Sequence, residues 1–309
     1  MDVSIIIRSY NEERFLFELL TKIHEQRTNY HYETILVDSG SQDNTLNIAK
    51  HFPIKIVRIP KEKFSFGYSL NQGISQSNGK FCLFISAHCI PVYDNWINEM
   101  IDPFYKNDQI ALVYGKQEGN ELTKYSEKQI FRKWYPNTAS FIQKNPFCNN
   151  ANASIRKSLW EIQPYNESLT GLEDLEWASK ILKTGYFLSY NPKASVYHIH
   201  QESFSQIYNR YKREAITLKS VYHEVKFTLF DFFKLSSLNI LTDWIHSLKD
   251  KEFMYSFFDI IRFRISQFWG TYKGYQLSNN ITDQLRERFY YPPKYEEKKK
   301  EELVINENL

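Results

Sequence analysis

Short apolar runs alternate with segments of helical periodicity along the first two hundred residues. The apolar runs are rich in Ile, Val, Leu and Phe, as buried strands are. They cover residues 3–10, 32–40, 54–60 and 80–87, and the helical segments between them cover residues 11–26, 41–52 and 67–78. This alternation predicts an α/β fold with a mostly parallel sheet flanked by crossover helices.

The pattern changes after about residue 203. Residues 204–290 contain long helical segments with heavy aromatic loading and interspersed Lys and Arg. Residues 291–309 are dominated by charged side chains, and we expect them to form a flexible tail. The chain is therefore expected to hold one α/β domain over residues 1–203, followed by a helical extension and the tail.

Composition excludes several classes of protein. A formal net charge of +3 is too mild to indicate a nucleic-acid partner. The three cysteines (Cys82, Cys89 and Cys148) have neither metal-ligand spacing nor an even disulfide set, so a reducing cytoplasm is expected. The first apolar run is too short for a signal peptide, and no stretch reaches the ~20 apolar residues of a membrane span.

Polar residues collect where three of the predicted strands end. They form the segments RSYNEE, DSGSQDNT and SAHCIP. In open α/β sheets ligands bind outside the carboxyl ends of the strands, so we expect one ligand to lie across all three segments. An aspartate at such a position, Asp38, can accept a hydrogen bond from a ribose or a base, although Asp38 and Asp43 would also suit helix capping. No G-x-G-x-x-G follows the first strand, which disfavours a dinucleotide site.

Four phrases in this order carry a family resemblance. They are VSIIIRSYNEERFL, ETILVDSGSQDNT, SLNQGISQSNGKFCLFIS and GLEDLEWASKILKTGY, and together they span about two thirds of the chain. The set resembles the family 2 inverting glycosyltransferases with the Rossmann-like GT-A fold, closest to the bacterial rhamnosyltransferase-like members. The resemblance implies that an enzyme transfers a sugar, with inversion, from a nucleotide diphosphate sugar to an acceptor hydroxyl. It divides the catalytic domain into a nucleotide-binding half, residues 1–92, and an acceptor half, residues 93–203.

The resemblance also implies which residues contact the donor nucleotide. They lie in the segments at the strand ends and in the third predicted helix. The expected residues are Ser9, Tyr10, Asn11, Glu12, Asp38, Ser39, Asp43, Asn71, Ser86, Ala87 and His88.

The fourth strand departs from the family pattern. The family usually carries an Asp-x-Asp motif there, which holds a divalent cation against the diphosphate, whereas this chain has Ser86, Ala87 and His88. His88 could be a nitrogen ligand for Mn²⁺ or another borderline cation, with His198 or His200, which we expect to point to opposite faces of a strand. Mg²⁺ is disfavoured in a site without carboxylates. Alternatively, His88 donates to the diphosphate without a metal, or is only a hydrogen-bonded histidine at a strand end.

An adjacent pair of carboxylates is expected to hold the catalytic base. Glu173 and Asp174 lie at the start of a predicted helix, where the helix dipole favours ionised carboxylates, and ordinary capping would explain them equally well. The resemblance assigns Asp174 as the base that takes the acceptor proton and Glu173 as acceptor orienter or alternate base. Trp177, one turn later, is a candidate for sugar stacking or for the core.

The acceptor half offers weaker signals. Asn149, Asn150 and Asn152 are short amides that could bind sugar hydroxyls or could be satisfied by a local turn. Arg156 could reach the diphosphate, and residues 115–145 are expected to form part of the acceptor wall.

The aromatic helices suggest a further contact. Apolar faces beside basic residues suit a helix at the surface of an anionic membrane leaflet, or packing on the catalytic domain or a second subunit. We expect a cytoplasmic enzyme, peripheral at the inner membrane face, that builds surface polysaccharide or a lipid-linked glycan. The alternative is a noncatalytic relative that binds nucleotide sugar or scaffolds a biosynthetic complex.

Overall fold

The computed structural model describes residues 1–222, 224–277 and 290. The predicted tail, residues 291–309, and the last part of the predicted extension lie outside the described residues. The chain divides into two compact units, Met1–Gln201 and Glu202–Leu309. Each unit is described by itself.

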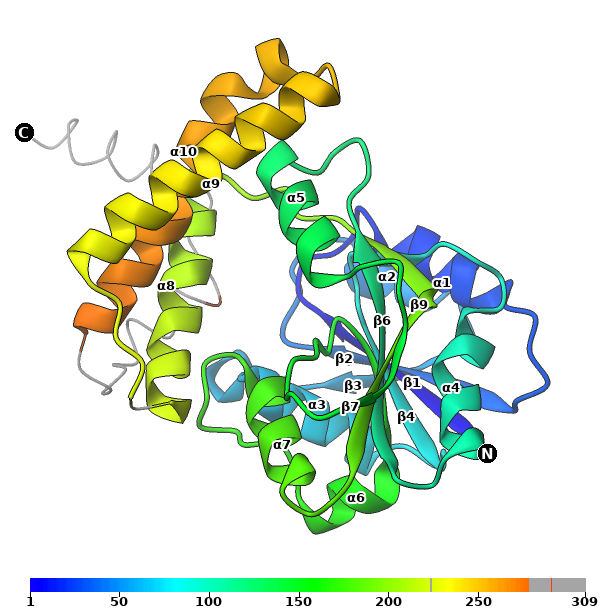
Figure 1. Ribbon diagram of the computed structural model, residues 1–309. Coiled ribbons are helices and arrows are strands. Elements are labelled where there is room, and N and C mark those ends of the chain that lie inside the picture. Colours follow the sequence, from blue (N-terminus) through cyan, green and yellow to red (C-terminus); the bar gives the residue numbers. More distant parts are fainter. Residues whose placement is uncertain (223, 278–289, 291–309) are drawn as a thin grey trace, which may run out of the picture. The chain divides into compact units, whose positions relative to one another are not determined.

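The first unit is built on one mixed sheet (Figure 1). Among the described residues the sheet has nine strands in the order β3-β2-β1-β4-β8-β6-β9-β5, with β7 paired to β9. The strands are β1 (Val3–Ser9), β2 (Tyr32–Asp38), β3 (Lys55–Arg58), β4 (Phe81–Ser86), β5 (Cys89–Pro91), β6 (Ile110–Glu118), β7 (Ser140–Gln143), β8 (Asn152–Arg156) and β9 (Phe187–His198).

The nucleotide half of the sheet is parallel, as its sequence pattern predicts. β1 lies between β2 and β4 and runs parallel to both, and β3 runs parallel to β2. β8 is antiparallel to β4 and β6, so the sheet becomes mixed in its second half. The carboxyl ends of β1, β2 and β4 consequently meet at one edge of the sheet.

Helices cover both faces of this sheet. They are α1 (Leu16–His24), α2 (Thr45–Ala49), α3 (Phe66–Ser75), α4 (Trp96–Lys106), α5 (Tyr125–Trp134), α6 (Lys157–Ile162) and α7 (Glu173–Leu182), with a 3₁₀ turn at Lys61–Lys63. Ile5 and Ile7 of β1 pack in one cluster with apolar residues of α1 and α4. Ile6 points to the opposite face, where a Cβ on Gly73 of α3 would come within 2.5 Å of its side chain. The alternation of faces along β1 thus anchors two helical layers.

The second unit contains three long helices in its described part. They are α8 (Phe204–Val221), α9 (Leu229–Lys249) and α10 (Phe253–Gln276). Gly270 and Gly274 let α10 approach α8 closely, because a Cβ at either position would come within 2.5 Å of a carbonyl oxygen of α8. Arg264 of α10 makes a bidentate ion pair with Asp243 of α9, with N···O distances of 2.8 and 2.9 Å, and both side chains are buried.

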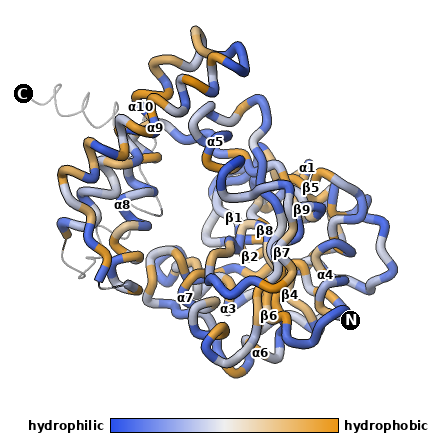
Figure 2. The backbone as a smooth tube through the Cα atoms, in the orientation of Figure 1, coloured by the Kyte–Doolittle hydropathy of each residue, from blue (hydrophilic) through white to orange (hydrophobic). Residues whose placement is uncertain are grey.

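Large apolar side chains are nevertheless exposed along α9 and α10. Hydrophobic and hydrophilic residues are intermixed along both helices (Figure 2). The exposed fraction is 72% for Phe230, 84% for Met254, 91% for Tyr255 and 68% for Phe258. No helix among the described residues combines the length and the apolarity needed to cross a bilayer.

Candidate active site

The loops that follow β1 and β2 are joined by hydrogen bonds. The N–H of Ser39 donates to the carbonyl of Ser9 over 3.1 Å. The N–H of Asn11 donates to Ser41 Oγ, and Asn11 Oδ1 accepts from the N–H of Gln42. Asn11 has a φ of 54°, a left-handed conformation that asparagine tolerates better than most residues. The two loops therefore form one continuous edge beside the sheet.

Asp38 and Asp43 hold this edge in shape. Asp38 Oδ2 accepts from the N–H groups of Gly40 and Ser41, each over 3.0 Å. Asp43 accepts from the N–H of Glu13 and from the N–H of Thr45, the first residue of α2. Asp43 therefore acts in part as a cap of α2, as the capping interpretation expected. Asp38 is held by the turn that follows β2, at the edge where we expect the nucleotide.

Glu12 ties the loop after β1 to the turn after β4. Its backbone N–H donates to Thr45 Oγ1 over 2.7 Å, and its Oε1 lies 2.7 Å from His88 Nδ1. A carboxylate oxygen can only accept, so His88 donates through Nδ1. Together these bonds bring all three polar segments of the sequence into one place, the carboxyl ends of β1, β2 and β4.

His88, His198 and His200 form a cluster of three imidazoles. Their ring centroids are separated by 5.2 Å for His88 and His198, 5.4 Å for His88 and His200, and 4.0 Å for the last two. The expectation that His198 and His200 point to opposite faces is wrong, because residues two apart in an extended segment share a face. One nitrogen from each of the three rings lies within 4.8 Å of the others, close enough to hold one metal ion.

Each ring of the cluster has an oxygen at its Nδ1. The partner atoms are Glu12 Oε1 for His88, Gln117 Oε1 at 2.6 Å for His198 and Glu127 Oε1 at 2.8 Å for His200. An Nδ1–H that donates to oxygen leaves the lone pair on Nε2, the arrangement that outer partners impose on histidines that bind metals. No local sequence pattern points to Gln117 or Glu127, which come from β6 and α5.

The carboxylates Glu173 and Asp174 lie side by side at the beginning of α7, and both are buried. Asp174 Oδ2 accepts from the N–H of Asn150 over 3.0 Å, and its Oδ1 accepts from the N–H of Leu175 over 2.8 Å. Burial, followed by the neighbouring Glu173, raises the pKa of Asp174 from 3.8 to about 7. A carboxylate with this pKa can both take and release a proton near neutral pH.

Arg8 of β1 is a further residue of this site that the sequence reasoning did not identify. Its Nη1 lies 3.2 Å from Glu173 Oε1, and its guanidinium stacks 4.9 Å over the ring of Phe66. Arg8 is the one charged residue inside an apolar strand, which is the signal that could have identified it. The ion pair engages Glu173, whereas Asp174 accepts from backbone N–H groups.

The three asparagines have different surroundings. Asn149 Oδ1 accepts from the N–H of Ala151, which closes a local turn. Asn150 positions the carboxylates, through its N–H to Asp174 and its Nδ2 at 3.5 Å from Glu173 Oε1. Asn152 is fully buried, so its amide serves the fold and does not face a sugar; it bonds to Trp96 Nε1 and to the carbonyls of Lys116 and Ala194.

Three further candidates also serve the fold. Asn71 Nδ2 donates to the carbonyl of Tyr165, and Asn71 Oδ1 accepts from Trp160 Nε1. Trp177 is fully buried, which removes it as a platform for sugar stacking. Arg156 pairs in register with Phe81 at the start of β4, at the end of that strand opposite His88, so the expectation that it reaches the diphosphate is wrong.

Comparison with known proteins identifies the class. The Glycosyl transferase family 2 model matches residues 4–162. The chain is 26% identical over 225 residues to the O-antigen chain rhamnosyltransferase WbaN of Salmonella anatum, covering 67% of this chain and 69% of that protein.

Solved structures agree on the fold. The mannosyltransferase PcManGT from Pyrobaculum calidifontis, in complex with GDP-Man and Mn²⁺, superposes with a TM-score of 0.56 at 15% identity, covering 94% of this chain and 88% of that one. Glucosyl-3-phosphoglycerate synthase from Mycobacterium tuberculosis, in complex with Mn²⁺ and UDP, gives a TM-score of 0.54 at 16% identity, covering 73% and 81%. The α/β architecture predicted from the sequence is therefore confirmed as a GT-A fold.

The chain belongs to glycosyl transferase family 2, and it is a glycosyltransferase.

Proposed function

We propose that this enzyme transfers a sugar, with inversion, from a nucleotide diphosphate sugar to a hydroxyl of a glycan or lipid-linked glycan in surface polysaccharide biosynthesis. The observation that carries the proposal is the buried Asp174, with its raised pKa, in the same unit as the three joined loops. The similarity to an O-antigen chain rhamnosyltransferase supports a polysaccharide acceptor. Transfer assays with a panel of nucleotide sugars test the proposal, and a donor that is bound without turnover would favour the noncatalytic alternative.

Inversion requires one in-line displacement at the anomeric carbon. Asp174 takes the proton of the acceptor hydroxyl as that oxygen bonds to the sugar, and the nucleoside diphosphate leaves from the opposite face. Glu173, which is paired with Arg8, orients the acceptor. The loops with Ser9, Tyr10, Asn11 and Glu12 and with Asp38, Ser39 and Asp43 bind the nucleotide, and Ser86, Ala87 and His88 face the diphosphate.

The three imidazoles fit a divalent cation. Their ring centroids are only 4.0 to 5.4 Å apart, and one nitrogen from each ring lies within 4.8 Å of the others. Neutral imidazole is a metal ligand that suits borderline ions such as Zn²⁺, Fe²⁺ and Ni²⁺, whereas Mg²⁺ prefers oxygen. His88, His198 and His200 would hold the ion, which would neutralise the diphosphate as it leaves.

Mn²⁺ is the ion present in the two solved neighbours. It accepts mixed nitrogen and oxygen ligands, so we include it among the candidate ions. The metal-free alternative has His88 donate to the diphosphate. That role requires a protonated Nε2, because Nδ1 of His88 already donates to Glu12.

We propose that the exposed apolar side chains of α9 and α10 contact the cytoplasmic face of a membrane. Phe230, Tyr255 and Phe258 are exposed there together with basic residues such as Lys234 and Arg262, a combination that suits the interface of a bilayer. A membrane surface would also supply a lipid-linked acceptor. A second copy of the chain is the competing occupant of this face, and the two are separated by the last experiment of the Discussion.

A further inference from the structure

A polar cavity of about 430 Å³ lies beside β6 and β9. Its other walls come from the loop after β5, from α4 and from the loop after α5. Part of the lining belongs to residues 115–145, the segment expected to contact the acceptor. The side chains that matter here are Tyr93, Glu99, Lys116, Glu118, Asn137 and Lys193.

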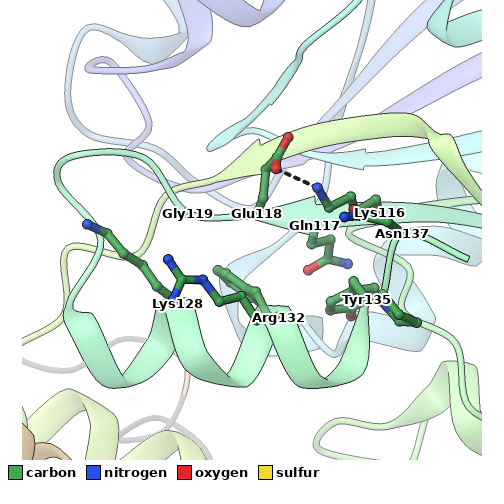
Figure 3. A pocket seen from close by; sticks show the side chains of 10 residues that line it. Lys116, Gln117, Glu118, Gly119, Lys128, Arg132, Tyr135 and Asn137 are labelled. Carbon is green, nitrogen blue, oxygen red and sulfur yellow. Dashed lines mark hydrogen bonds and ion pairs between the residues drawn. The ribbon is translucent and has the colours of Figure 1, made fainter. Parts of the chain in front are cut away.

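The cavity lies on the side of β6 that faces away from the imidazole cluster. Gln117 bonds to His198 Nδ1 over 2.6 Å, so its side chain points to the cluster. Lys116 and Glu118 are its neighbours along the strand and therefore point to the other face. Figure 3 shows Glu118 and Gln117 on opposite sides of β6. The loops expected to bind the donor nucleotide contribute no residue to the lining, so the cavity is separate from the expected donor site.

Two carboxylates of the lining are held in place by hydrogen bonds within the protein. Glu118 Oε2 accepts from Lys116 Nζ over 2.7 Å, and its Oε1 accepts from Ser195 Oγ over 2.8 Å. Glu99 Oε2 accepts from Asn191 Nδ2 over 2.9 Å. A carboxylate offers about four lone-pair positions, so both groups can accept from further donors. The cavity thus presents fixed acceptors that suit the hydroxyl groups of a ligand.

The rest of the lining favours an uncharged ligand with an apolar face. The charges balance, because Lys116 and Lys193 offset the two glutamates. A phosphate or carboxylate ligand would meet both of these carboxylates. The ring of Tyr93 is 53% exposed and offers a flat apolar surface with a hydroxyl at its edge. A neutral sugar carries both hydroxyl groups and an apolar C–H face, so it matches the acceptors and the ring together.

A second cavity continues from this one past the end of β6. Lys116, Glu118 and Asn137 line both cavities, and the second one reaches Gln117. The side chain of Gln117 is buried, and its Nε2 has no hydrogen-bond partner within the described part of the chain. A buried donor of this kind favours a ligand that brings an oxygen to it. The two cavities therefore form one polar path from Tyr93 to the residue that bonds to the imidazole cluster.

We propose that the cavity at Tyr93 binds a neutral sugar unit of the acceptor at a distance from the hydroxyl that reacts, so that the enzyme recognises a glycan longer than one sugar. The inference rests on the proposed function, because it names an acceptor subsite of the same transferase. Tyr93 stacks on the sugar ring, and Glu99 and Glu118 accept from its hydroxyl groups. Asn137, which lines both cavities, contacts the next unit of the glycan.

Binding of glycans to the full chain tests this proposal. Each protein is first saturated with a nucleoside diphosphate, which blocks the donor site, and is then applied to an array of neutral and acidic bacterial oligosaccharides. Isothermal titration with the glycans that bind gives their affinities. The variants are Tyr93→Ala, Tyr93→Phe and Asn137→Ala. The matched control is Tyr105→Ala, since Tyr105 is a tyrosine of the same unit with an exposed fraction of 55% and lies outside the cavity.

We expect the parent to bind neutral oligosaccharides. Tyr93→Ala should weaken that binding about tenfold or more, because the stacking surface is lost, whereas Tyr93→Phe keeps the ring and should stay within about threefold of the parent. Asn137→Ala should weaken it about threefold or more, as expected for loss of a hydrogen bond, and Tyr105→Ala should leave it unchanged. The nucleoside diphosphate affinity should be equal in every protein.

Three results would overturn the inference while leaving the proposed function intact. The first is that no glycan binds although the nucleoside diphosphate does, and the second is that only acidic glycans bind. The third is that Tyr93→Ala binds neutral glycans as well as the parent does, or loses no more affinity than Tyr105→Ala. If no nucleoside diphosphate binds to the parent protein, the proposed function itself fails.

Discussion

His88 Nδ1 and Glu12 Oε1 lie 2.7 Å apart, so a carboxylate from the loop after β1 fixes the imidazole in the turn after β4. The Nδ1–H that donates to this carboxylate leaves the lone pair of the ring on Nε2. The pair leads to a test of the proposed metal site.

Replacing Glu12 by Gln should weaken divalent-cation binding about 10-fold to 100-fold, the usual effect of losing an outer partner of a metal ligand. The amide can present its NH₂ group to His88 and reverse the tautomer. Isothermal titration with Zn²⁺ and Mn²⁺ measures the change. The neighbouring variant Glu13→Gln is the control, since the Glu13 carboxylate accepts from the N–H of Asn44 in the loop after β2. Equal cation affinity in the parent and Glu12→Gln would contradict this role.

Removing a ring of the cluster should have a larger effect. His198→Ala and His200→Ala are each expected to lower cation affinity by at least about 100-fold, because a ligand itself is lost. Turnover in the parent should fall in excess chelator and recover with a borderline ion better than with Mg²⁺. Full turnover in chelator would instead support diphosphate binding by His88 without a metal.

The raised pKa of Asp174 predicts how activity depends on pH. The base must be ionised to take a proton, so kcat/KM should rise with pH and reach half of its maximum near the pKa of about 7. Asp174→Asn should lower kcat by about 100-fold or more while nucleotide affinity stays within about threefold. Glu176→Gln, two residues later on α7, is the control and should retain turnover and the pH profile. A flat profile between pH 5 and 8, measured with saturating cation, would exclude Asp174 as the base.

The raised pKa of Asp174 also makes the free energy of unfolding depend on pH. A carboxyl whose pKa rises on folding favours the protonated form in the folded state, so the stability it contributes is present below pH 3.8 and is lost as the pH rises to about 7. Asp174 therefore destabilises the folded protein at the pH where it is active. A buried carboxylate that destabilises the folded protein in this way is consistent with a catalytic role of Asp174.

Arg8 and Glu173 predict a stability effect that the sequence alone does not suggest. Removing one partner leaves the other buried and unpaired, so Arg8→Met should destabilise the protein by about 3 kcal/mol. The double variant Arg8→Met/Glu173→Leu should recover a large part of this loss, because no buried charge remains. Denaturant unfolding of the parent, both single variants and the double variant measures the coupling. If the losses of stability in the two single variants add up to the loss in the double variant, the ion pair makes no specific contribution to the free energy of unfolding.

The sequence predicted the nucleotide half better than the acceptor half, for a physical reason. β1, β2 and β4 are short strands with apolar centres and polar loops after them, so the local pattern predicts the edge where the loops after Ser9, Asp38 and Ser86 meet. The first helix begins at Leu16 and not at residue 11, because residues 11–13 bond to the next loop instead. Such a contact between loops has no local sequence signal.

The asparagines show which contacts the local sequence does not predict. Asn150 positions the carboxylate of Asp174. Asn152 and Asn71 instead accept hydrogen bonds from the tryptophan N–H groups of α4 and α6. The three amides look alike in the sequence, and only the packing of distant helices separates them. The partners of His198 and Glu173 likewise come from segments far away in the chain.

The exposed side chains of α9 and α10 give the last prediction. A variant with Phe230, Tyr255 and Phe258 replaced by Ser should bind vesicles containing anionic lipid at least about tenfold more weakly than the parent, because each large apolar side chain contributes about 1.5 to 3 kcal/mol when it leaves water. Phe141→Ser/Ile142→Ser is the control, since both residues are apolar side chains of the first unit with an exposed fraction of 57%. Co-sedimentation measures binding, and light scattering gives the mass in solution. If the parent does not bind vesicles but forms a dimer, and the triple variant abolishes this dimer, the face binds a second copy of the chain.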